Sequence, residues 1–381
     1  MQIHYISPSV LPSRNANAVH VLKQCDALAR HCEEVFCYAR RSVLSSDLAE
    51  EKIRGEYGLL SPNLTFRTHF FPSNRAVSFL IAMHSFLRIL ATSEARVLSR
   101  NLYASFLWGV IFSRELLFET HQLETGVRKW MQHLLIKRSN VTTIVISRKL
   151  EEILQEYHQT SIKNSVVLHD AAEADSQRYD KVLKTVVLKE YGINNGSWRS
   201  VCGYFGHLYL GRGMEIIVAM AEHSPDDLFI VVGGTKTDIE RLRAKHLEVR
   251  NLKILGFMPH SEAQRLMKAV DVLLMPYQRS VSIGVQGHDT ARWMSPMKMF
   301  EYMACGVPII SSDLDVLKEV LTDGVNALLV TPEDSSKWCA ALEWIMSNKS
   351  LAYSIGEKAY RDYSDLYTWD KRAERIIAEF R

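Results

Sequence analysis

The chain has 381 residues, more than one ordinary hydrophobic core accommodates, so its length predicts two domains of usual size. Hydrophobic residues make up 47% and charged residues 23% of the chain, a composition that excludes a disordered protein. The formal net charge of +3 is too small for a dedicated nucleic-acid-binding protein, so we expect no nucleic-acid partner.

Cysteine usage points to a reducing environment. The chain has 6 cysteines, but no two show Cys-x-x-Cys spacing and no histidine cluster would complete a zinc site. Several lie in apolar runs, as Cys305 does, so we expect buried free thiols. Residues 1–7 read as a short strand rather than a signal peptide, and no apolar run is long enough to span a membrane. These features predict a cytoplasmic protein.

Short apolar or β-branched runs alternate with amphipathic helical stretches in the first half of the chain. Residues 17–31 show the helical pattern clearly, with apolar side chains near a 3.6-residue period. The predicted strands of this half are 2–6, 34–39, 64–70, 96–99, 115–120, 141–146 and 164–168.

The second half repeats this alternation, which is typical of parallel sheets covered by helices on both faces. Its predicted strands are 200–205, 228–232, 253–255, 271–275, 307–311 and 327–330. Its predicted helices are 213–222, 238–246, 261–269, 297–304, 314–321 and 335–347.

The pattern weakens between residues 170 and 198, which divides the chain. We predict one α/β domain over 1–180, a second over 181–366, and a helix over 367–381 that packs back on the first. Both domains are predicted to be doubly wound and Rossmann-like. Ligands of open parallel sheets bind beyond the carboxyl ends of the strands, so we expect the site in loops after strands, in a cleft between the domains.

A glycine-rich loop follows the predicted strand 200–205. It contains Gly206, His207, Gly211, Arg212 and Gly213, and a helix is predicted to begin directly after it. Glycines at a strand-to-helix turn let backbone amides approach an anion, and Arg212 adds a positive charge suited to a diphosphate. The alternative is an ordinary turn with a surface arginine.

The segment 293–308 is the most informative stretch of the sequence. Ser295 is expected to cap a helix that has Pro296 in its first turn, which leaves backbone amides for a phosphate. Lys298 precedes Glu301 by one helical turn. A carboxylate in this otherwise apolar helix suggests hydrogen bonds from a ribose diol, whereas the alternative is a Lys–Glu surface pair.

These motifs together resemble glycosyltransferase family 4, the retaining glycosyltransferases of the GT-B fold. The resemblance covers nearly the whole chain, and its most specific part is the Ser-Pro-x-Lys-x-x-Glu run that begins at Ser295. The other matching segments are Ala18-Val19-His20-Val21, Glu119-Thr120-His121, Ile144-Val145-Ile146-Ser147, Gly206-His207-Leu208-Tyr209, Val232-Gly233-Gly234 and Asp271-Val272-Leu273-Leu274-Met275-Pro276-Tyr277.

The resemblance implies a role for each matching residue. Glu301 would bind the donor ribose, and Arg212 and Lys298 would neutralise the diphosphate as catalytic cations. His121, the third catalytic candidate, would lie near the donor sugar. A histidine that closes a strand in the core is the alternative for His121. The remaining donor-binding residues implied are Gly206, His207, Gly234, Ser295 and Met297, those near the helix start contributing backbone amides.

One position departs from the family pattern. Many members carry two glutamates with seven residues between them, but Trp293 stands at the first of these positions. His288 and Asp289 in the preceding loop are our candidates for replacement sugar contacts. Otherwise sugar recognition differs, or activity is lost.

Two acidic residues suggest a metal site that we discount. Asp313 and Asp315 form an Asp-x-Asp pattern, but they follow a predicted strand at the start of a predicted helix, where aspartate is ordinary. Glu319 is expected on the face of that same helix. We expect no metal and no cofactor besides the nucleotide-sugar co-substrate.

The first domain is modestly basic near the segment 75–84, which mixes apolar and basic side chains. It is either a core element with a solvated rim or a surface that rests on anionic lipid at the inner face of the membrane. The basic residues nearby are Arg75, Arg88, Arg128, Lys129, Lys137 and Arg138.

The leading hypothesis is therefore a metal-independent, retaining hexosyltransferase of polysaccharide or glycoconjugate synthesis. It would use a UDP- or GDP-sugar donor and a glycan or lipid-linked acceptor, the latter bound around residues 7–18 and His121 of the first domain. The alternatives are a nucleotide-sugar epimerase on the same fold and a non-catalytic nucleotide-sugar binder, the second encouraged by Trp293.

Overall fold

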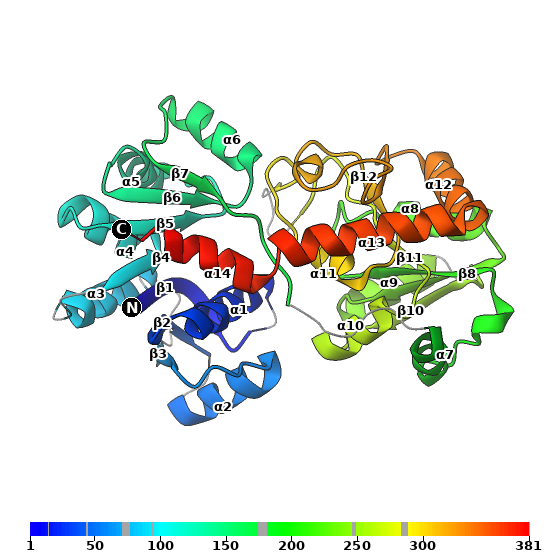
Figure 1. Cartoon of the computed structure of the whole chain (residues 1–381), viewed down its shortest axis with the longest axis horizontal. Helices are drawn as coiled ribbons and strands as arrows, with labels where there is room; N and C mark the ends of the chain where they lie inside the picture. Colours follow the sequence, from blue (N-terminus) through cyan, green and yellow to red (C-terminus); the bar gives the residue numbers. More distant parts are fainter. Residues whose placement is uncertain are drawn as a thin grey trace. The chain divides into compact units, whose positions relative to one another are not determined.

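The computed structural model describes residues 1–13, 15–42, 45–70, 77–90, 92, 95–173, 181–245, 249–282 and 289–380. The chain divides into two compact units (Figure 1). Unit 1 comprises Met1–Glu173 and Thr368–Arg381, and unit 2 comprises Ala174–Tyr367. The sequence analysis placed these divisions at 180/181 and 366/367.

Unit 1 is built on a parallel sheet which, among the described residues, has 7 strands in the order β3-β2-β1-β4-β5-β6-β7. The strands are β1 (Gln2–Leu11), β2 (Glu34–Arg41), β3 (Leu64–Phe70), β4 (Arg96–Ser99), β5 (Leu116–Thr120), β6 (Val141–Val145) and β7 (Ser165–Val167). β1 is longer than predicted because it pairs with β2 again at Val10, after a shift in register beyond Ile6.

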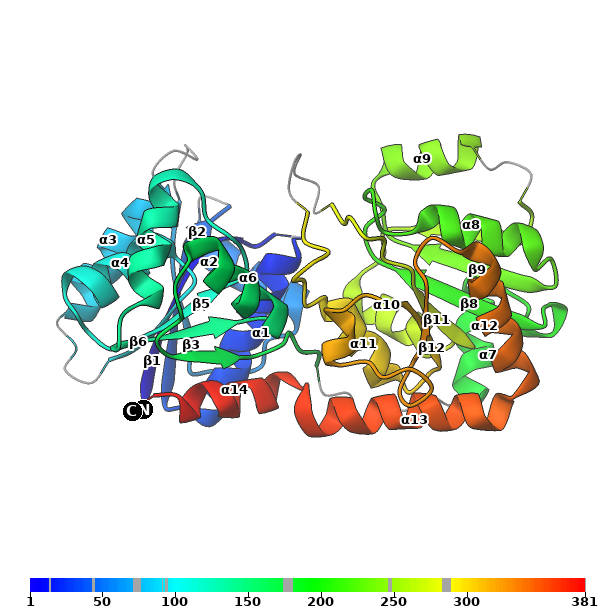
Figure 2. The same cartoon turned by 90° about the horizontal axis from the view of Figure 1, so that it is seen from above.

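Helices cover both faces of this sheet. Figure 2 shows α3, α4 and α5 on one side and α14 on the other, where α14 packs against α1. The helices are α1 (Ala16–His31), α2 (Ser46–Tyr57), α3 (Val77–Leu90), α4 (Leu102–Phe106) with a π-helical turn (Leu107–Ile111), α5 (Gly126–Ile136), α6 (Arg148–His158) and α14 (Trp369–Ala378).

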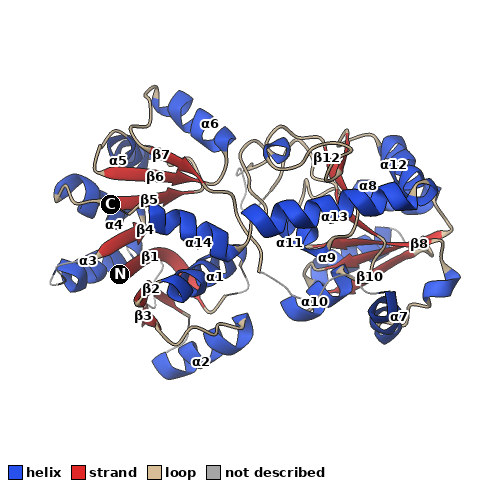
Figure 3. Cartoon of the chain, in the orientation of Figure 1, coloured by secondary structure: helices blue, strands red, loops and turns tan. Residues whose placement is uncertain are grey.

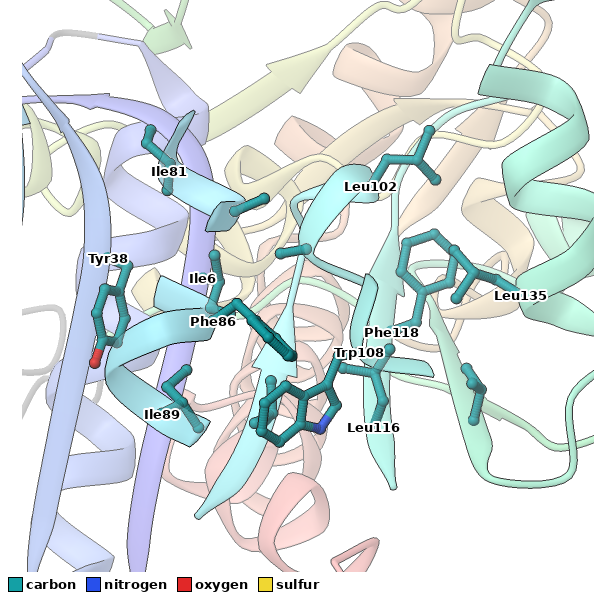
Figure 4. Close-up of a cluster of buried hydrophobic side chains, with 14 of the residues drawn as sticks. Ile6, Tyr38, Ile81, Phe86, Ile89, Leu102, Trp108, Leu116, Phe118 and Leu135 are labelled. Atoms are coloured by element: carbon teal, nitrogen blue, oxygen red, sulfur yellow. The ribbon is translucent and has the colours of Figure 1, made fainter. Parts of the chain in front are cut away.

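The core of unit 1 forms where side chains that alternate along the strands meet α3, α4 and α5. Ile6 and Phe118 from the sheet pack with Phe86 of α3 and Trp108 of the π-helical turn (Figure 4). All four are under 9% exposed. Burial of such large side chains stabilises by roughly 1.5–3 kcal/mol each, enough to fix this face of the sheet.

Unit 2 repeats the arrangement of a sheet flanked by helices (Figure 3). Its parallel sheet has the order β10-β9-β8-β11-β12-β13 within the described part of the chain. Numbered within each unit, the described strands of unit 2 and the first six strands of unit 1 follow the order 3-2-1-4-5-6, which is that of doubly wound Rossmann-like domains, and β7 extends the sheet of unit 1 beyond it. The strands are β8 (Ser200–Phe205), β9 (Asp227–Val232), β10 (Leu252–Gly256), β11 (Val272–Met275), β12 (Ile309–Ser312) and β13 (Leu328–Val330).

The helices of unit 2 place the loops that matter for function. α8 and α12 pack in one core cluster with the sheet, while α11 lies on the opposite face, where Tyr302 contacts Phe205. The helices are α7 (Lys181–Glu190), α8 (Met214–His223), α9 (Lys236–Lys245), α10 (His260–Met267), α11 (Met297–Cys305), α12 (Ser335–Ser347) and α13 (Lys349–Leu366). Short 3₁₀ turns lie at Asn195–Ser197 and Leu317–Glu319.

The helix predicted over 314–321 is wrong: only the 3₁₀ turn Leu317–Glu319 forms there. A segment of 8 residues is too short to hold a helix by propensity alone. Backbone groups of this segment instead hydrogen-bond to the side chain of Asn326. Its Nδ2 donates to the Val320 carbonyl, and its Oδ1 accepts from the Thr322 amide.

No helix among the described residues combines the length and the apolar character needed to cross a membrane.

Candidate functional site

The loop after β8 is glycine-rich because it packs closely on its neighbours. A Cβ added to Gly211 or Gly213 would lie 1.9 Å from a carbonyl oxygen, that of Ser280 or that of Pro276. Gly213, at φ 78°, is the N-cap of α8. These close approaches seat Arg212 beside Tyr277, which follows β11.

Arg212 is held in place but not fully paired. Its Nη1 donates to the Tyr277 hydroxyl at 2.9 Å, its Nη2 lies 3.4 Å from the Ser282 carbonyl oxygen, and its guanidinium lies 5.0 Å from the centroid of the Tyr277 ring. Its Nε is buried and has no hydrogen-bond partner among the described residues. A buried donor without an acceptor costs free energy, and an anion that accepts from Arg212 Nε would remove that cost.

Lys298 lies against the same tyrosine. Its ammonium is 3.9 Å from the centroid of the Tyr204 ring and 5.1 Å from that of Tyr277. Burial, and then repulsion by Arg212, hold the pKa of Lys298 well below its ordinary value, although Glu301 opposes the shift. A Cβ at Gly206 would lie 2.9 Å from the lysine Nζ, so glycine at this position lets the ammonium approach.

Glu301 lies one turn along α11 from Lys298, with a side chain that is 17% exposed. Its Oε1 is 3.8 Å from His260 Nε2, which is beyond hydrogen-bond distance. The two flanking residues Phe300 and Tyr302 are fully buried. The Glu301 carboxylate is therefore partly accessible to solvent, and its role in binding a ribose stays a prediction.

The start of α11 differs from the prediction. Pro296 is the N-cap, with φ −78° and ψ 121°, so the expected cap at Ser295 is wrong by one residue. The ψ value keeps Pro296 outside the helical range, and Met297 becomes the first helical residue. The amides of Met297 and Lys298 belong to the first turn and have no intrahelical acceptor.

His207 and Gly234 complete the cluster predicted around the glycine loops. The His207 ring stacks on the Tyr209 ring with 4.8 Å between the centroids. The backbone carbonyl of His207 accepts a hydrogen bond from the Tyr204 hydroxyl at 2.6 Å. Burial first, then Arg212 and Lys298, lower the pKa of His207. A Cβ at Gly234 would lie 2.5 Å from Leu208, so the loops after β8 and β9 are in contact.

The proposed replacements for the missing glutamate have different outcomes. His288 lies outside the described residues. Asp289 is engaged by the backbone, since its Oδ1 accepts from the amides of Val281 and Ala291 at 2.8 and 2.9 Å. Those bonds account for its lowered pKa against the opposing effect of burial. Its carboxylate therefore fastens its own loop.

Both aspartates of the Asp-x-Asp pattern form ion pairs with Lys318. Lys318 Nζ lies 2.8 Å from Asp313 and 3.1 Å from Asp315, and these carboxylates raise the lysine pKa. Glu319 lies in the 3₁₀ turn rather than on a helix face. Lys318 therefore offsets only one of the two negative charges on this surface of unit 2.

His121, in unit 1, is part of a buried ionic network that sequence reasoning did not find. Its Nε2 lies 2.9 Å from Glu119 Oε1, and its Nδ1 lies 3.0 Å from Arg100 Nη2. Glu119 is fully buried and also accepts from His20 Nε2 at 3.0 Å and from Arg372 Nη2 at 2.8 Å. Arg372 is 253 positions away from Glu119 in the chain, so no local pattern indicates the pair.

Metal binding does not account for this network. His20, His121 and Asp170 bring three atoms of metal-binding type within 4.8 Å of one another. However, both histidines already engage Glu119 through Nε2, and the guanidinium groups of Arg372 and Arg100 lie beside them. A further cation would be repelled here, so we interpret the cluster as a hydrogen-bonded charge network.

The fold is the GT-B fold, with two Rossmann-like domains. HepE from Anabaena in complex with UDP superposes with a TM-score of 0.76 at 14% identity, over 99% of each chain. WaaG, a glycosyltransferase involved in lipopolysaccharide biosynthesis, has a TM-score of 0.68 at 13% identity, over 99% of this chain and 100% of that chain.

Sequence comparison points to the same class of protein for unit 2. Residues 199–348 match the family model of glycosyl transferases group 1. D-inositol 3-phosphate glycosyltransferase of Corynebacterium aurimucosum is 22% identical over 268 residues, 66% of this chain and 59% of that protein. Phosphatidyl-myo-inositol mannosyltransferase of Mycolicibacterium smegmatis is 29% identical over 180 residues, 45% of this chain and 43% of that protein. The chain thus spans less than two thirds of the length of these relatives.

Proposed function

We propose that the protein is a group 1 glycosyltransferase that takes its sugar from a nucleoside diphosphate sugar bound by unit 2. One observation carries this proposal: Arg212 and Lys298 share the tyrosine-walled site although like charges repel, and Arg212 Nε is buried without a partner among the described residues. A bound diphosphate removes both costs at once. The complexes of HepE with UDP and with UDP-glucose support a donor of this class.

The chemistry follows from where charge develops. When the sugar leaves, negative charge builds on the nucleoside diphosphate, and fixed cations stabilise it most effectively. Arg212, Lys298 and the first-turn amides of α11 supply that stabilisation, so transfer of a hexose proceeds without a metal ion. Glu301 accepts from the ribose diol. The resemblance to family 4 supports retention at the anomeric carbon.

Unit 1 is proposed to bind the acceptor, a glycan or a lipid-linked sugar, near His121. The relatives named for inositol phosphate and phosphatidyl-myo-inositol, and the O-antigen chain mannosyltransferase C of Escherichia coli, support polysaccharide or glycoconjugate synthesis. The 6 free cysteines are consistent with a cytoplasmic location.

We further propose that unit 1 contacts the inner face of the membrane through α3. One face of α3 is buried through Ile81, Phe86 and Ile89, as the core interpretation predicts. The opposite face exposes large apolar side chains next to the exposed Arg88, a combination that suits an anionic lipid surface. These side chains are Phe79, Leu80, Leu87 and Leu90, at 49%, 42%, 65% and 52% exposure.

A panel of nucleotide-sugars tested by calorimetry, with and without EDTA, examines the donor proposal. We expect one UDP- or GDP-sugar to bind with unchanged affinity after chelation. Absence of binding by every donor contradicts the proposal, and loss of binding with EDTA contradicts metal independence. Radiolabelled donor incubated with acceptor then separates transfer from an epimerase, which converts the donor alone, and from a binder, which converts nothing.

A further inference from the structure

The hydrogen bonds around His121 determine which of its nitrogens carries the proton. Arg100 contacts Nδ1, and a guanidinium group only donates, so Nδ1 is the acceptor. Glu119 contacts Nε2, and its pKa lies well below the ordinary value because Arg372, then His20, outweigh the effect of burial. An ionised carboxylate only accepts, so Nε2 carries the hydrogen.

Glu119 is held by residues from three other parts of unit 1. Its Oε2 accepts from the Tyr5 hydroxyl of β1 at 3.0 Å, and its Oε1 receives His20 of α1 and Arg372 of α14. Because the Glu119 side chain is fully buried, these bonds are not exchanged for water. The carboxylate that meets His121 is therefore fixed in one orientation.

Arg372 is the only member of this network that comes from the C-terminal segment of unit 1, within the described chain. Its side chain is 2% exposed. Its Nε donates to the His169 carbonyl at 3.0 Å, its Nη1 donates to Gln24, and its Nη2 donates to Glu119. A guanidinium group with three fixed directions transmits the position of α14 to Glu119.

We propose that Arg372 is a positioning residue which, through Glu119, holds His121 as a neutral imidazole protonated on Nε2, with Nδ1 committed to Arg100. It follows that His121 is not a proton acceptor in the free protein. Its Nδ1 lone pair becomes available only when Arg100 turns away, for example toward a bound substrate. This inference goes beyond the proposed function and rests on it only for the kinetic measurement below.

Charge and burial favour the same state. Burial, and then Arg100, lower the pKa of His121 to about 4, while Glu119 opposes the shift. The imidazole is therefore neutral over the physiological range. The titratable and charged groups that face it are Glu119 of β5, Arg100 after β4, His20 of α1, Asp170 after β7 and Arg372 of α14.

The direct test is a nitrogen-correlated NMR spectrum of protein labelled in its 14 histidines. His121 is assigned by the signal lost in His121→Asn. We expect one neutral species with hydrogen on Nε2, unchanged down to about pH 5. In Arg372→Met, more of the Glu119 charge acts on His121, so the His121 pKa should rise by about one unit or more. Glu119 also loses a donor that fixes its orientation, so hydrogen on Nδ1 should become detectable beside hydrogen on Nε2.

Matched variants separate positioning from folding. Arg375, on the same helix, is exposed and donates to the Val167 carbonyl at 3.0 Å, so Arg375→Met should change neither the pKa nor the tautomer of His121. Arg372→Lys should restore part of the effect. If Arg372→Met does not fold, Arg372→Lys, which keeps the charge but not the three donor directions, should show a smaller rise in the His121 pKa and a partial loss of the Nε2 tautomer.

Kinetics give a second readout. Arg372→Met should lower kcat about tenfold or more and leave KM for the donor unchanged, because the donor contacts lie in unit 2. An ordinary His121 pKa in the wild type, or an unaltered tautomer in folded Arg372→Met, overturns the inference. A wild type with the expected spectrum but no transfer activity overturns the proposed function instead.

Discussion

At the scale of single residues, the sequence indicated three charged residues of the proposed donor site but not the tyrosines that pack against them. Arg212, Lys298 and Glu301 were found because they lie in motifs of known spacing. Tyr277, which packs against both cations, and Tyr204, which packs against Lys298, lie in post-strand and strand positions where a tyrosine is ordinary core. No local signal distinguishes such a tyrosine, because its role depends on side chains far away in the chain, such as Arg212, which is 65 positions from Tyr277.

Lys298 is expected to contribute to donor affinity through its charge. Replacement by methionine in Lys298→Met keeps the packing and removes a charge-assisted contact of about 1.5–3 kcal/mol, so donor affinity should fall about 10- to 150-fold. Isothermal calorimetry of the wild type and of Lys298→Met measures this difference in donor affinity. Lys318→Met is the control, since Lys318 is paired with Asp313 and Asp315, and it should bind donor as the wild type does.

Donor binding should also take up a proton at Lys298. Its pKa is lowered in the free protein by burial and by Arg212, and a bound diphosphate raises it. Since the bound-state pKa is the higher one, this contribution to affinity is complete below the free-state pKa and is lost as pH rises through the bound-state pKa. Calorimetry in buffers of different ionisation enthalpy detects the proton, and Lys298→Met should abolish the buffer dependence. A wild-type heat that is independent of buffer across that pH range contradicts this mechanism.

Glu301 offers a test of ribose recognition. Glu301→Gln preserves shape but weakens two hydrogen bonds to the diol, so we expect about a tenfold loss of affinity for nucleotides with ribose. A nucleotide with a deoxyribose should show a smaller loss. Asp315→Asn, at a side chain 78% exposed, is the control and should have no effect.

At the scale of elements, strand prediction succeeded because buried parallel strands are short apolar runs bounded by turn residues. Helix prediction failed where small side chains or long-range bonds decide the outcome. α13 was not predicted, although its buried residues Ala352, Ile355, Ala359 and Tyr363 show helical spacing. It follows α12 after Asn348 alone, without a glycine or proline to mark the break. In the segment 314–321 the error is the opposite one. Its apolar residues have helical spacing, but only a 3₁₀ turn forms and the backbone at Val320 and Thr322 bonds to Asn326 instead.

The exposed face of α3 is expected to bind anionic vesicles. Leu87→Glu replaces a side chain that is 65% exposed, so it should leave stability within about 0.5 kcal/mol and reduce co-sedimentation with vesicles of phosphatidylglycerol. Leu351→Glu, at 58% exposure on α13 of unit 2, is the matched control. Equal vesicle binding by both variants and the wild type would show that α3 is not the contact surface.

At the scale of the whole molecule, the alternation of strands and helices predicted two doubly wound domains, and the two sheets have the corresponding strand order. Composition and periodicity sufficed because each core is filled by its own elements. The network that joins β5 to α14 was beyond that reasoning, since Glu119 and Arg372 are brought together only by the return of the chain to unit 1.

That division predicts where a donor stabilises the protein. A ligand that binds only the folded state stabilises by about 2.7 kcal/mol at one hundred times its Kd, and it does so in the unit that binds it. Hydrogen exchange measured with saturating donor should therefore slow in residues 206–213 and 297–305 of unit 2. Exchange in β5 and α14 of unit 1 should change much less, because their hydrogen bonds do not involve the donor. Protection confined to unit 1 would contradict our proposal that unit 2 binds the donor. Protection in unit 2 that disappears in Lys298→Met would show that the stabilisation depends on the diphosphate site.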